Sequence, residues 1–144
     1  MIHGLPAVLV VTALFSTLAS VKAADDKQAA RIADGEWNVQ LKPAASNKVK
    51  GTTQPYDDTL SIKDGKFSTA VNTKYGFAPV AYSVKTVGGK TILTAELNDE
   101  KHGKSAYELE VKGGKVEGKM TWGKLGEGGK PISAEYTVTG EMKK

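Results

Sequence analysis

The chain of 144 residues contains no cysteine, which excludes disulfide frameworks, thiol catalysis, iron–sulfur clusters and cysteine-ligated zinc. Arginine is almost as scarce, since Arg31 is the single arginine among 20 basic residues, against 16 acidic ones. A net charge of +4 with so little arginine disfavours nucleic-acid recognition, which relies on bidentate arginine contacts. The length allows one domain with a hydrophobic core.

Long apolar runs are missing too, except near the N-terminus. Residues 5–18 are mostly apolar, and the small residues Val21 and Ala23 follow at the −3 and −1 positions of a cut after Ala23. This pattern predicts a secretory signal peptide over residues 1–23 and a periplasmic or secreted protein without a remaining membrane span. The alternative is an uncleaved anchor, because Met1, Ile2 and His3 carry no lysine or arginine, but the run is short for a membrane span.

The next segment, residues 24–34, is predicted to be a short helix or arm, because acidic residues precede good helix formers and Asp34-Gly35 ends the pattern. From residue 35 to residue 144 the apolar period is two, which predicts one β domain. Eight strands are expected, over residues 37–41, 60–62, 67–71, 80–84, 92–97, 107–111, 116–122 and 132–138. Their strict apolar–polar alternation indicates antiparallel strands with one buried face. An outer-membrane barrel is disfavoured because most of these strands are shorter than the roughly 9–11 residues typical of one.

The connections alternate between short and long. Asp64-Gly65, Gly88-Gly89 and Gly113-Gly114 are typical of two-residue hairpin turns. Residues 43–55, 72–79, 98–104 and 123–131 form longer loops. An up-and-down meander would place all tight turns at one end, and closure into a barrel would remove both sheet edges. We therefore predict an eight-stranded antiparallel up-and-down barrel with a closed tight-turn end and a long-loop mouth.

Gly35-Glu36-Trp37 opens the first strand, and this G-x-W motif with the eight-strand meander resembles the lipocalins and their calycin relatives. The resemblance implies a lipocalin-like barrel in which Gly35 and Trp37 plug the closed end. It covers roughly residues 25–142, although these two positions are its only residue-level motif. Two lipocalin features are missing here, an arginine over the tryptophan from the last strand and a helix after that strand.

Groups for catalysis are few. After signal cleavage His102 is the one remaining histidine, and it lies in a polar loop that we interpret as solvated. Asp57 and Asp58 are adjacent and read as turn or edge residues, one facing in and one out if a strand begins there. The glycine-rich residues 123–130 lack the order of a phosphate-binding loop and are interpreted as flexible. We expect no catalytic residue, no metal site, no cofactor and no enzymatic activity.

The interior offers a binding site. The inward faces would carry the candidate ligand-binding residues Phe67, Tyr82, Tyr107, Met120, Trp122 and Tyr136, while Thr69, Ala95, Gly118, Ala134 and Gly140 leave room between them. The mouth would carry Tyr56, Tyr75 and Phe77, surrounded by Lys48, Lys50, Lys74, Lys101, Lys104, Lys124 and Lys130. We therefore expect an exported, non-enzymatic barrel for a small hydrophobic or amphipathic ligand, with a weak preference for anions.

The alternative is a protein-binding or inhibitor-like module that uses its long loops. Protease-inhibitor barrels of the periplasm also begin with G-x-W, but this chain lacks the disulfide expected of them. A void above about 300 Å³ would favour the small ligand, whereas exposed aromatic side chains on the loops would favour a protein partner.

Overall fold

A computed structural model describes residues 32–144, and within them the chain runs as nine antiparallel strands in one sheet. The strands are β1 (Gly35–Pro43), β2 (Tyr56–Lys63), β3 (Lys66–Thr69), β4 (Val80–Ala81), β5 (Ser83–Val87), β6 (Lys90–Asp99), β7 (Gly103–Lys112), β8 (Lys115–Leu125) and β9 (Pro131–Met142). The helix α2 (Ala70–Lys74) and the 3₁₀ turn η1 (Glu127–Gly129) lie between strands. The predicted signal peptide over residues 1–23 and nearly all of the predicted arm over residues 24–34 lie outside the described residues.

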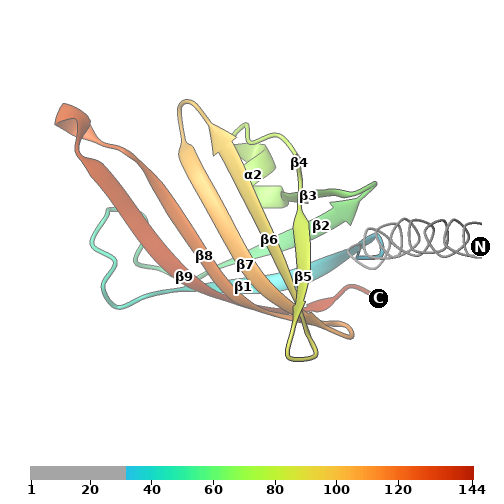
Figure 1. Cartoon of the computed structure of the whole chain (residues 1–144). Helices are drawn as coiled ribbons and strands as arrows, with labels where there is room; N and C mark the ends of the chain where they lie inside the picture. Colours follow the sequence, from blue (N-terminus) through green and yellow to red (C-terminus); the bar gives the residue numbers. More distant parts are fainter. Residues whose placement is uncertain (1–31) are drawn as a thin grey trace, which may run out of the picture. The chain divides into compact units, whose positions relative to one another are not determined.

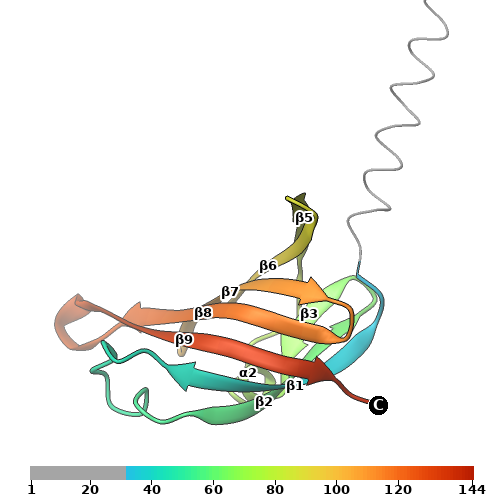
Figure 2. The same cartoon turned by 90° about the horizontal axis from the view of Figure 1, so that it is seen from below.

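Apart from β4 and β5, strands that follow one another in the chain lie side by side in the sheet, and β1 also pairs with β9 (Figures 1 and 2). The order around the sheet is β4-β3-β2-β1-β9-β8-β7-β6-β5. The two edge strands, β4 and β5, are consecutive in the chain and separated only by Tyr82. The sheet is therefore a nearly closed barrel, which confirms the prediction of an all-β antiparallel barrel.

The predicted number of eight strands is wrong, because the strand expected over residues 80–84 is two strands. Val80 and Ala81 pair with β3, whereas β5 pairs with β6. The chain changes partner at Tyr82, whose hydroxyl accepts a hydrogen bond from the Ile32 amide (3.1 Å) and donates one to the Ile32 carbonyl (3.2 Å). Alternation continues through this change of partner, so the sequence pattern does not reveal the break.

The tight turns and the long loops occupy opposite ends of the barrel. Asp64, Gly65, Gly88 and Gly89 have positive φ angles, as two-residue hairpin turns require. The start of β1 lies at the same end, since Gly35 pairs with Ile62. Strands β6 to β9 are longer than expected, at 10, 10, 11 and 12 residues, which shortens the connection between β6 and β7 to residues 100–102.

The strand expected over residues 67–71 ends early, because residues 70–74 form α2. Thr69 caps this helix, with its side-chain oxygen accepting a hydrogen bond from the Asn72 amide at 3.0 Å. The Val71 amide donates to the Asp58 side chain at 3.0 Å instead of to a neighbouring strand. The prediction of a strand through Val71 is therefore wrong, since capping and a buried carboxylate outweigh the local alternation.

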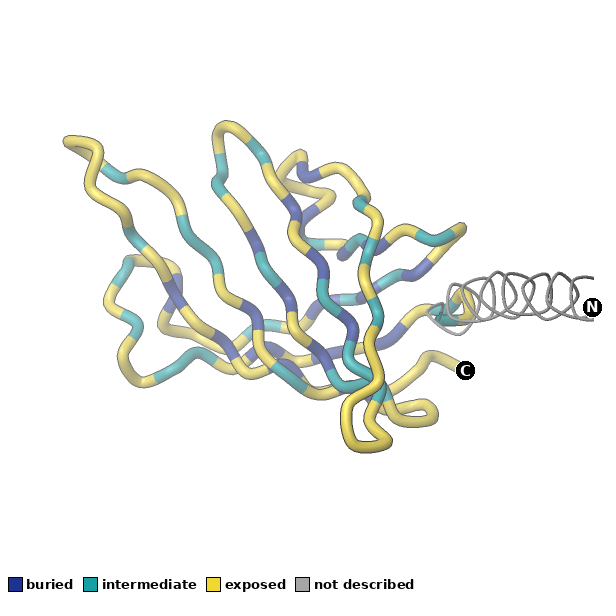
Figure 3. Tube along the Cα trace, viewed as in Figure 1, coloured by how far each residue is buried: buried dark blue, intermediate teal, exposed yellow. Residues whose placement is uncertain are grey.

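The core fills the inside of the barrel along the predicted inward rows (Figure 3). Its least exposed large side chains are Leu41, Leu60, Phe67, Leu93, Leu97, Leu109 and Val138. Gly118 and Gly140 lie on inward rows but do not open space, because a Cβ on Gly118 would collide with the Glu108 carbonyl and one on Gly140 with the Asn38 carbonyl. These two glycines allow close approach of adjacent strands, so the expectation that they leave room for a ligand is wrong.

Candidate functional site

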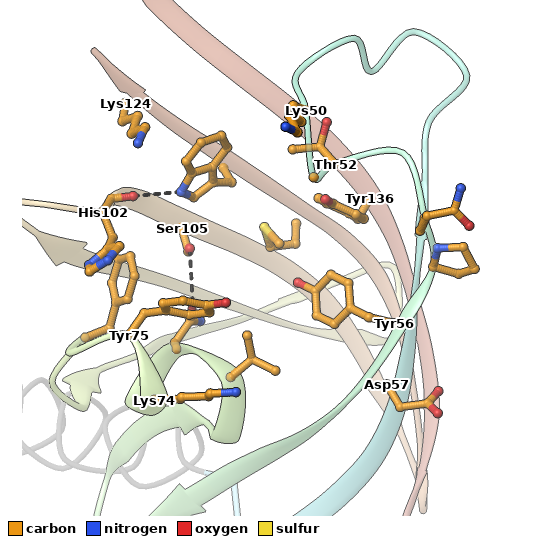
Figure 4. A pocket seen from close by; sticks show the side chains of 18 residues that line it. Lys50, Thr52, Tyr56, Asp57, Lys74, Tyr75, His102, Ser105, Lys124 and Tyr136 are labelled. Atoms are coloured by element: carbon orange, nitrogen blue, oxygen red, sulfur yellow. Dashed lines mark hydrogen bonds between the residues drawn. The ribbon is translucent and has the colours of Figure 1, made fainter. Parts of the chain in front are cut away.

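The long-loop end of the barrel contains a pocket of about 540 Å³ (Figure 4). It lies between the β1–β2 loop, α2 and the adjoining ends of β7, β8 and β9. Its lining consists of Lys50, Gly51, Thr52, Gln54, Pro55, Tyr56, Asp57, Val71, Asn72, Lys74, Tyr75, Phe77, His102, Ser105, Met120, Trp122, Lys124 and Tyr136. The volume exceeds the roughly 300 Å³ that marks the lower bound of small-molecule sites.

Aromatic side chains form the walls. Tyr56 and Tyr136 meet edge to face with ring centroids 5.5 Å apart, and Tyr75 lies 5.4 Å from the His102 ring. Trp122 is held in place by its indole N–H, which donates to the His102 carbonyl at 2.8 Å. Burial raises the pKa of Tyr56 and of Tyr136, so both hydroxyls stay protonated at neutral pH and can donate or accept a hydrogen bond.

Buried polar groups lie at the inner side of the pocket. The Asn72 side-chain amide, on α2, donates to the Tyr107 hydroxyl at 3.0 Å. The Ser105 hydroxyl donates to Asn72 Oδ1 at 3.4 Å, the bond marked at Ser105 in Figure 4. Asn72 is 7% exposed and Ser105 is 2% exposed. Burial raises the pKa of Tyr107 as well, so this network is neutral. It attaches α2 to β7 and presents amide and hydroxyl groups to the pocket.

The β1–β2 loop is held against the barrel by Asn47. Its side-chain amide donates to the carbonyls of Thr52 (3.0 Å) and Glu135 (2.8 Å), and its side-chain oxygen accepts from the Glu135 amide at 2.9 Å. The Thr52 hydroxyl donates to the Val49 carbonyl at 2.6 Å. These bonds fold the loop over β9 and place Lys50 beside the pocket (Figure 4).

The pocket rim is positively charged. Lys50, Lys74 and Lys124 come from three different segments, and none forms an ion pair within residues 32–144. The one acidic lining residue is Asp57, whose carboxylate points away from the pocket in Figure 4. Lys124 also lies over the Trp122 ring, with its ammonium 5.8 Å from the centroid.

His102 lies at the pocket edge, and its side chain is hydrogen-bonded and partly buried, whereas we expected a solvated loop residue. Its Nδ1 is 2.8 Å from Asp99 Oδ2, and the same carboxylate oxygen accepts from the His102 backbone amide at 2.9 Å. The hydrogen bond with the His102 side chain lowers the pKa of Asp99, so this carboxylate stays charged. The arrangement fixes the imidazole against Tyr75 and Phe77. Across residues 32–144, no group of three or more histidine, aspartate and glutamate side chains is placed to hold a metal ion.

Asp58 lies inside the barrel, contrary to our expectation of a turn or edge residue. Asp57 is exposed, as the alternation required, but Asp58 is 7% exposed and lies inside the barrel on the row of Leu60 and Ile62. Its Oδ1 accepts from the amides of Val71 (3.0 Å) and Thr59 (2.7 Å). Burial raises the pKa of this carboxyl despite those bonds. Asp58 is therefore an interior group under α2 and not a turn or edge residue.

The six candidate ligand-binding residues fall into three places. Met120, Trp122 and Tyr136 line the pocket. Phe67 and Tyr107 are buried deeper, with ring centroids 5.0 Å apart, and do not line it. Tyr82 lies at the break between β4 and β5.

Gly35 and Trp37 lie at the opposite, tight-turn end, where Trp37 is 2% exposed and pairs with Leu60 and Met142. We expected Tyr56, Tyr75 and Phe77 at the mouth, and all three line the pocket. The polar pair Asn72 and Ser105 was not expected there. The Thr69–Asn72 spacing of a helix N-cap was the available signal for Asn72.

Within residues 32–144, no helix has the length and apolar character needed to cross a membrane. Comparisons with known protein families, with curated proteins and with solved structures found no match for this chain.

Proposed function

We propose that the chain is an exported, non-enzymatic binding protein that takes up a small amphipathic molecule at the long-loop end of its barrel. The observation that carries this proposal is the 540 Å³ pocket, which is lined by aromatic side chains and by buried hydrogen-bonding groups from separate elements. Small-molecule sites typically combine a concave, mostly apolar lining with a few fixed polar groups. Export is proposed from the signal-peptide pattern over residues 1–23.

The pocket supports binding without chemistry on the ligand. Met120 and the aromatic walls supply apolar contact area, while Asn72, Ser105 and the tyrosine hydroxyls supply orientation. Apolar burial on binding produces a negative heat-capacity change, which calorimetry measures directly.

A protein partner is the second candidate, and two exposed side chains at the same end favour it. Tyr75 is 50% exposed and Leu125 is 70% exposed. Tyr75 follows α2 and Leu125 is the last residue of β8, and aromatic side chains are enriched at protein–protein interfaces. This candidate becomes the leading one if small molecules fail to bind.

Tryptophan fluorescence tests the proposal, because the two tryptophans lie at opposite ends of the barrel. Trp122 lines the pocket, whereas Trp37 is buried at the tight-turn end. A panel of fatty acids, quinones, steroids and aromatic acids, each at about 50 µM, covers micromolar sites. We expect a binding compound to change the wild-type emission and raise the melting temperature.

The matched variants assign the response. The fluorescence change should vanish in Trp122→Phe and persist in Trp37→Phe. If no compound shifts either the emission or the melting temperature of the wild-type protein, the small-molecule function is refuted and a protein partner takes its place.

A further inference from the structure

We propose that the ligand of this pocket is a compact aromatic monoanion, with its ring between the aromatic walls and its charged group, most simply a carboxylate, toward Lys50, Lys74 and Lys124. This inference rests on the proposed small-molecule function and narrows it to one chemical class. Three observations carry it: the composition of the walls, the charge of the rim and the packing below the pocket.

The walls concentrate the aromatic side chains of the chain. The sequence has three phenylalanines, two tryptophans and five tyrosines, and five of these ten line the pocket: Tyr56, Tyr75, Phe77, Trp122 and Tyr136. Tyr75 is half exposed, with its ring tilted by 52° against the ring of His102. Rings arranged edge to face or tilted accept a further ring in offset-stacked or T-shaped contact, which adds roughly 0.5–1.5 kcal/mol per pair beyond area burial.

The rim favours a negative charge. Elsewhere on the barrel Lys90 pairs with Glu110, Lys104 with Glu96 and Lys143 with Glu36. Most other lysines of residues 32–144 have no acidic partner, and three of these unpaired lysines, Lys50, Lys74 and Lys124, surround one opening (Figure 4).

The nearby carboxylates do not neutralise these lysines. Asp57 lines the pocket, but its carboxylate points away from it (Figure 4). Asp99 is hydrogen-bonded to His102, and Asp58 does not line the pocket and accepts hydrogen bonds from two backbone amides. An anion therefore meets three unpaired ammonium groups on entry, whereas a cation is repelled by them.

Packing below the pocket limits the ligand's length. On the inward row of β7, Tyr107 and Leu109 follow the pocket residue Ser105 toward the tight-turn end, and at 2% and 1% exposure they fill the barrel below the pocket. Met120 and Tyr136, at 3% and 6% exposure, close the inner side of the pocket. A long alkyl chain would have to fold up to fit, at a cost in rotamer freedom, whereas a planar ring system loses little conformational entropy on binding.

Four probes of similar size separate these requirements in a calorimetric titration of the purified protein. They are naphthalene-2-carboxylate, the neutral naphthalene-2-methanol, the cationic naphthalen-2-ylmethylammonium and the alkyl anion undecanoate. We expect the aromatic carboxylate to bind about tenfold more tightly than the neutral alcohol, as a few screened ion pairs would produce. The cation should bind most weakly, and undecanoate should bind more weakly than the aromatic carboxylate.

Charge variants test the rim. The triple variant Lys50→Gln, Lys74→Gln, Lys124→Gln should lose most of the preference for the carboxylate over the alcohol, and about 0.5 M salt should reduce the preference in the wild type. The control is a second triple variant with the same change in net charge: Lys63→Gln, Lys66→Gln, Lys112→Gln. These three lysines are exposed and lie near the tight-turn end, so the control variant should keep the preference for the carboxylate over the alcohol.

The outcomes separate this inference from the function on which it rests. If the alcohol or the cation binds as tightly as the carboxylate, or if undecanoate binds more tightly, the ligand class is wrong while small-molecule binding stands. If both triple variants lose the preference equally, the rim lysines are not the anion site. If none of the four probes binds, the ligand class is refuted, and the wider compound panel decides the small-molecule function separately.

Discussion

At the scale of single residues, Asp58 is unusual because a carboxyl group occupies a core position. It faces inward between Tyr56 and Leu60, and its Oδ2 has no hydrogen-bond partner within residues 32–144. Two backbone amides satisfy only Oδ1. The Asp58 carboxyl holds the first turn of α2 through its hydrogen bond from the Val71 amide. Because burial disfavours the charged form, the pKa of Asp58 is raised.

The raised pKa predicts how stability depends on pH. The pKa of an unfolded aspartate is about 3.9. When the pKa is higher in the folded protein, the protonated carboxyl stabilises the folded state, and this stabilisation is lost as the pH rises through the folded pKa. Asp58→Asn cannot titrate and keeps an oxygen for the Val71 and Thr59 amides. We expect its free energy of unfolding, relative to wild type, to improve from pH 4 to pH 7 in urea titrations.

Asp57→Asn is the matched control, because it changes an exposed carboxylate at the neighbouring position. It should show little of this trend. A difference between Asp58→Asn and wild type that is constant across this pH range would show that the Asp58 carboxyl does not titrate at a raised pKa in the folded protein.

Trp37 allows a second prediction at this scale. It is 2% exposed, and its indole N–H has no partner within residues 32–144. Trp37→Ala should lower the free energy of unfolding by about 3–5 kcal/mol, nearer the lower value because the unpaired N–H is removed as well. Trp37→Phe keeps a ring and should cost less. Chemical denaturation measures both, and a loss below about 1 kcal/mol in the alanine variant would contradict the core role of Trp37.

At the scale of elements, period-two alternation predicted most strands, and the exceptions have local causes. Alternation cannot show that Thr69 caps a helix, because Phe67, Thr69 and Val71 also fit a strand. It cannot show a change of partner at Tyr82, because both halves of that strand keep the same inward face. The turns were more informative, because positive φ angles restrict residue choice to glycine and a few others.

The pairing of β1 with β9 depends on Gly140. A Cβ at this position would collide with the Asn38 carbonyl and with Val39. Gly140→Ala should therefore lower the free energy of unfolding by about 1–3 kcal/mol through overpacking. Gly114→Ala is the control, since its Cβ would reach only the Met142 side chain at 3.7 Å. Equal denaturation midpoints for the two variants would show that the β1–β9 contact adapts to the extra methyl group.

At the scale of the whole molecule, the prediction of export concerns residues 1–23. Val21 and Ala23 supply the small side chains that signal peptidase recognises, so the exported protein should begin at Ala24. Intact-mass measurement of the protein from the exported fraction checks this. Recovery of a membrane-bound species that retains residues 1–23 would instead support the anchor interpretation.

The fold class was predictable at this scale, but the pocket was only partly so. Turn lengths and alternation were enough to predict a barrel with two different ends. The expected mouth aromatics Tyr56, Tyr75 and Phe77 do line the pocket. Of the seven lysines expected around the mouth, three line the pocket (Lys50, Lys74 and Lys124) and four do not (Lys48, Lys101, Lys104 and Lys130). The alternation did not show how far each inward residue lies from the mouth of the barrel. Phe67 and Tyr107 were therefore expected in the pocket but lie beneath it. Strand stagger decides depth, and alternation carries no information about stagger.

The pairing of β1 with β9 also determines when the barrel can form. These strands come from opposite ends of the described chain, and the ion pair between Lys143 and Glu36 joins residues 107 positions apart. Such non-local pairing slows folding, because a large loop must close before the contacts form. Until β9 arrives, β1 has a partner on one side only, and the apolar rows of both strands remain exposed. The protein therefore cannot complete its barrel during synthesis before the last residues of β9 are available.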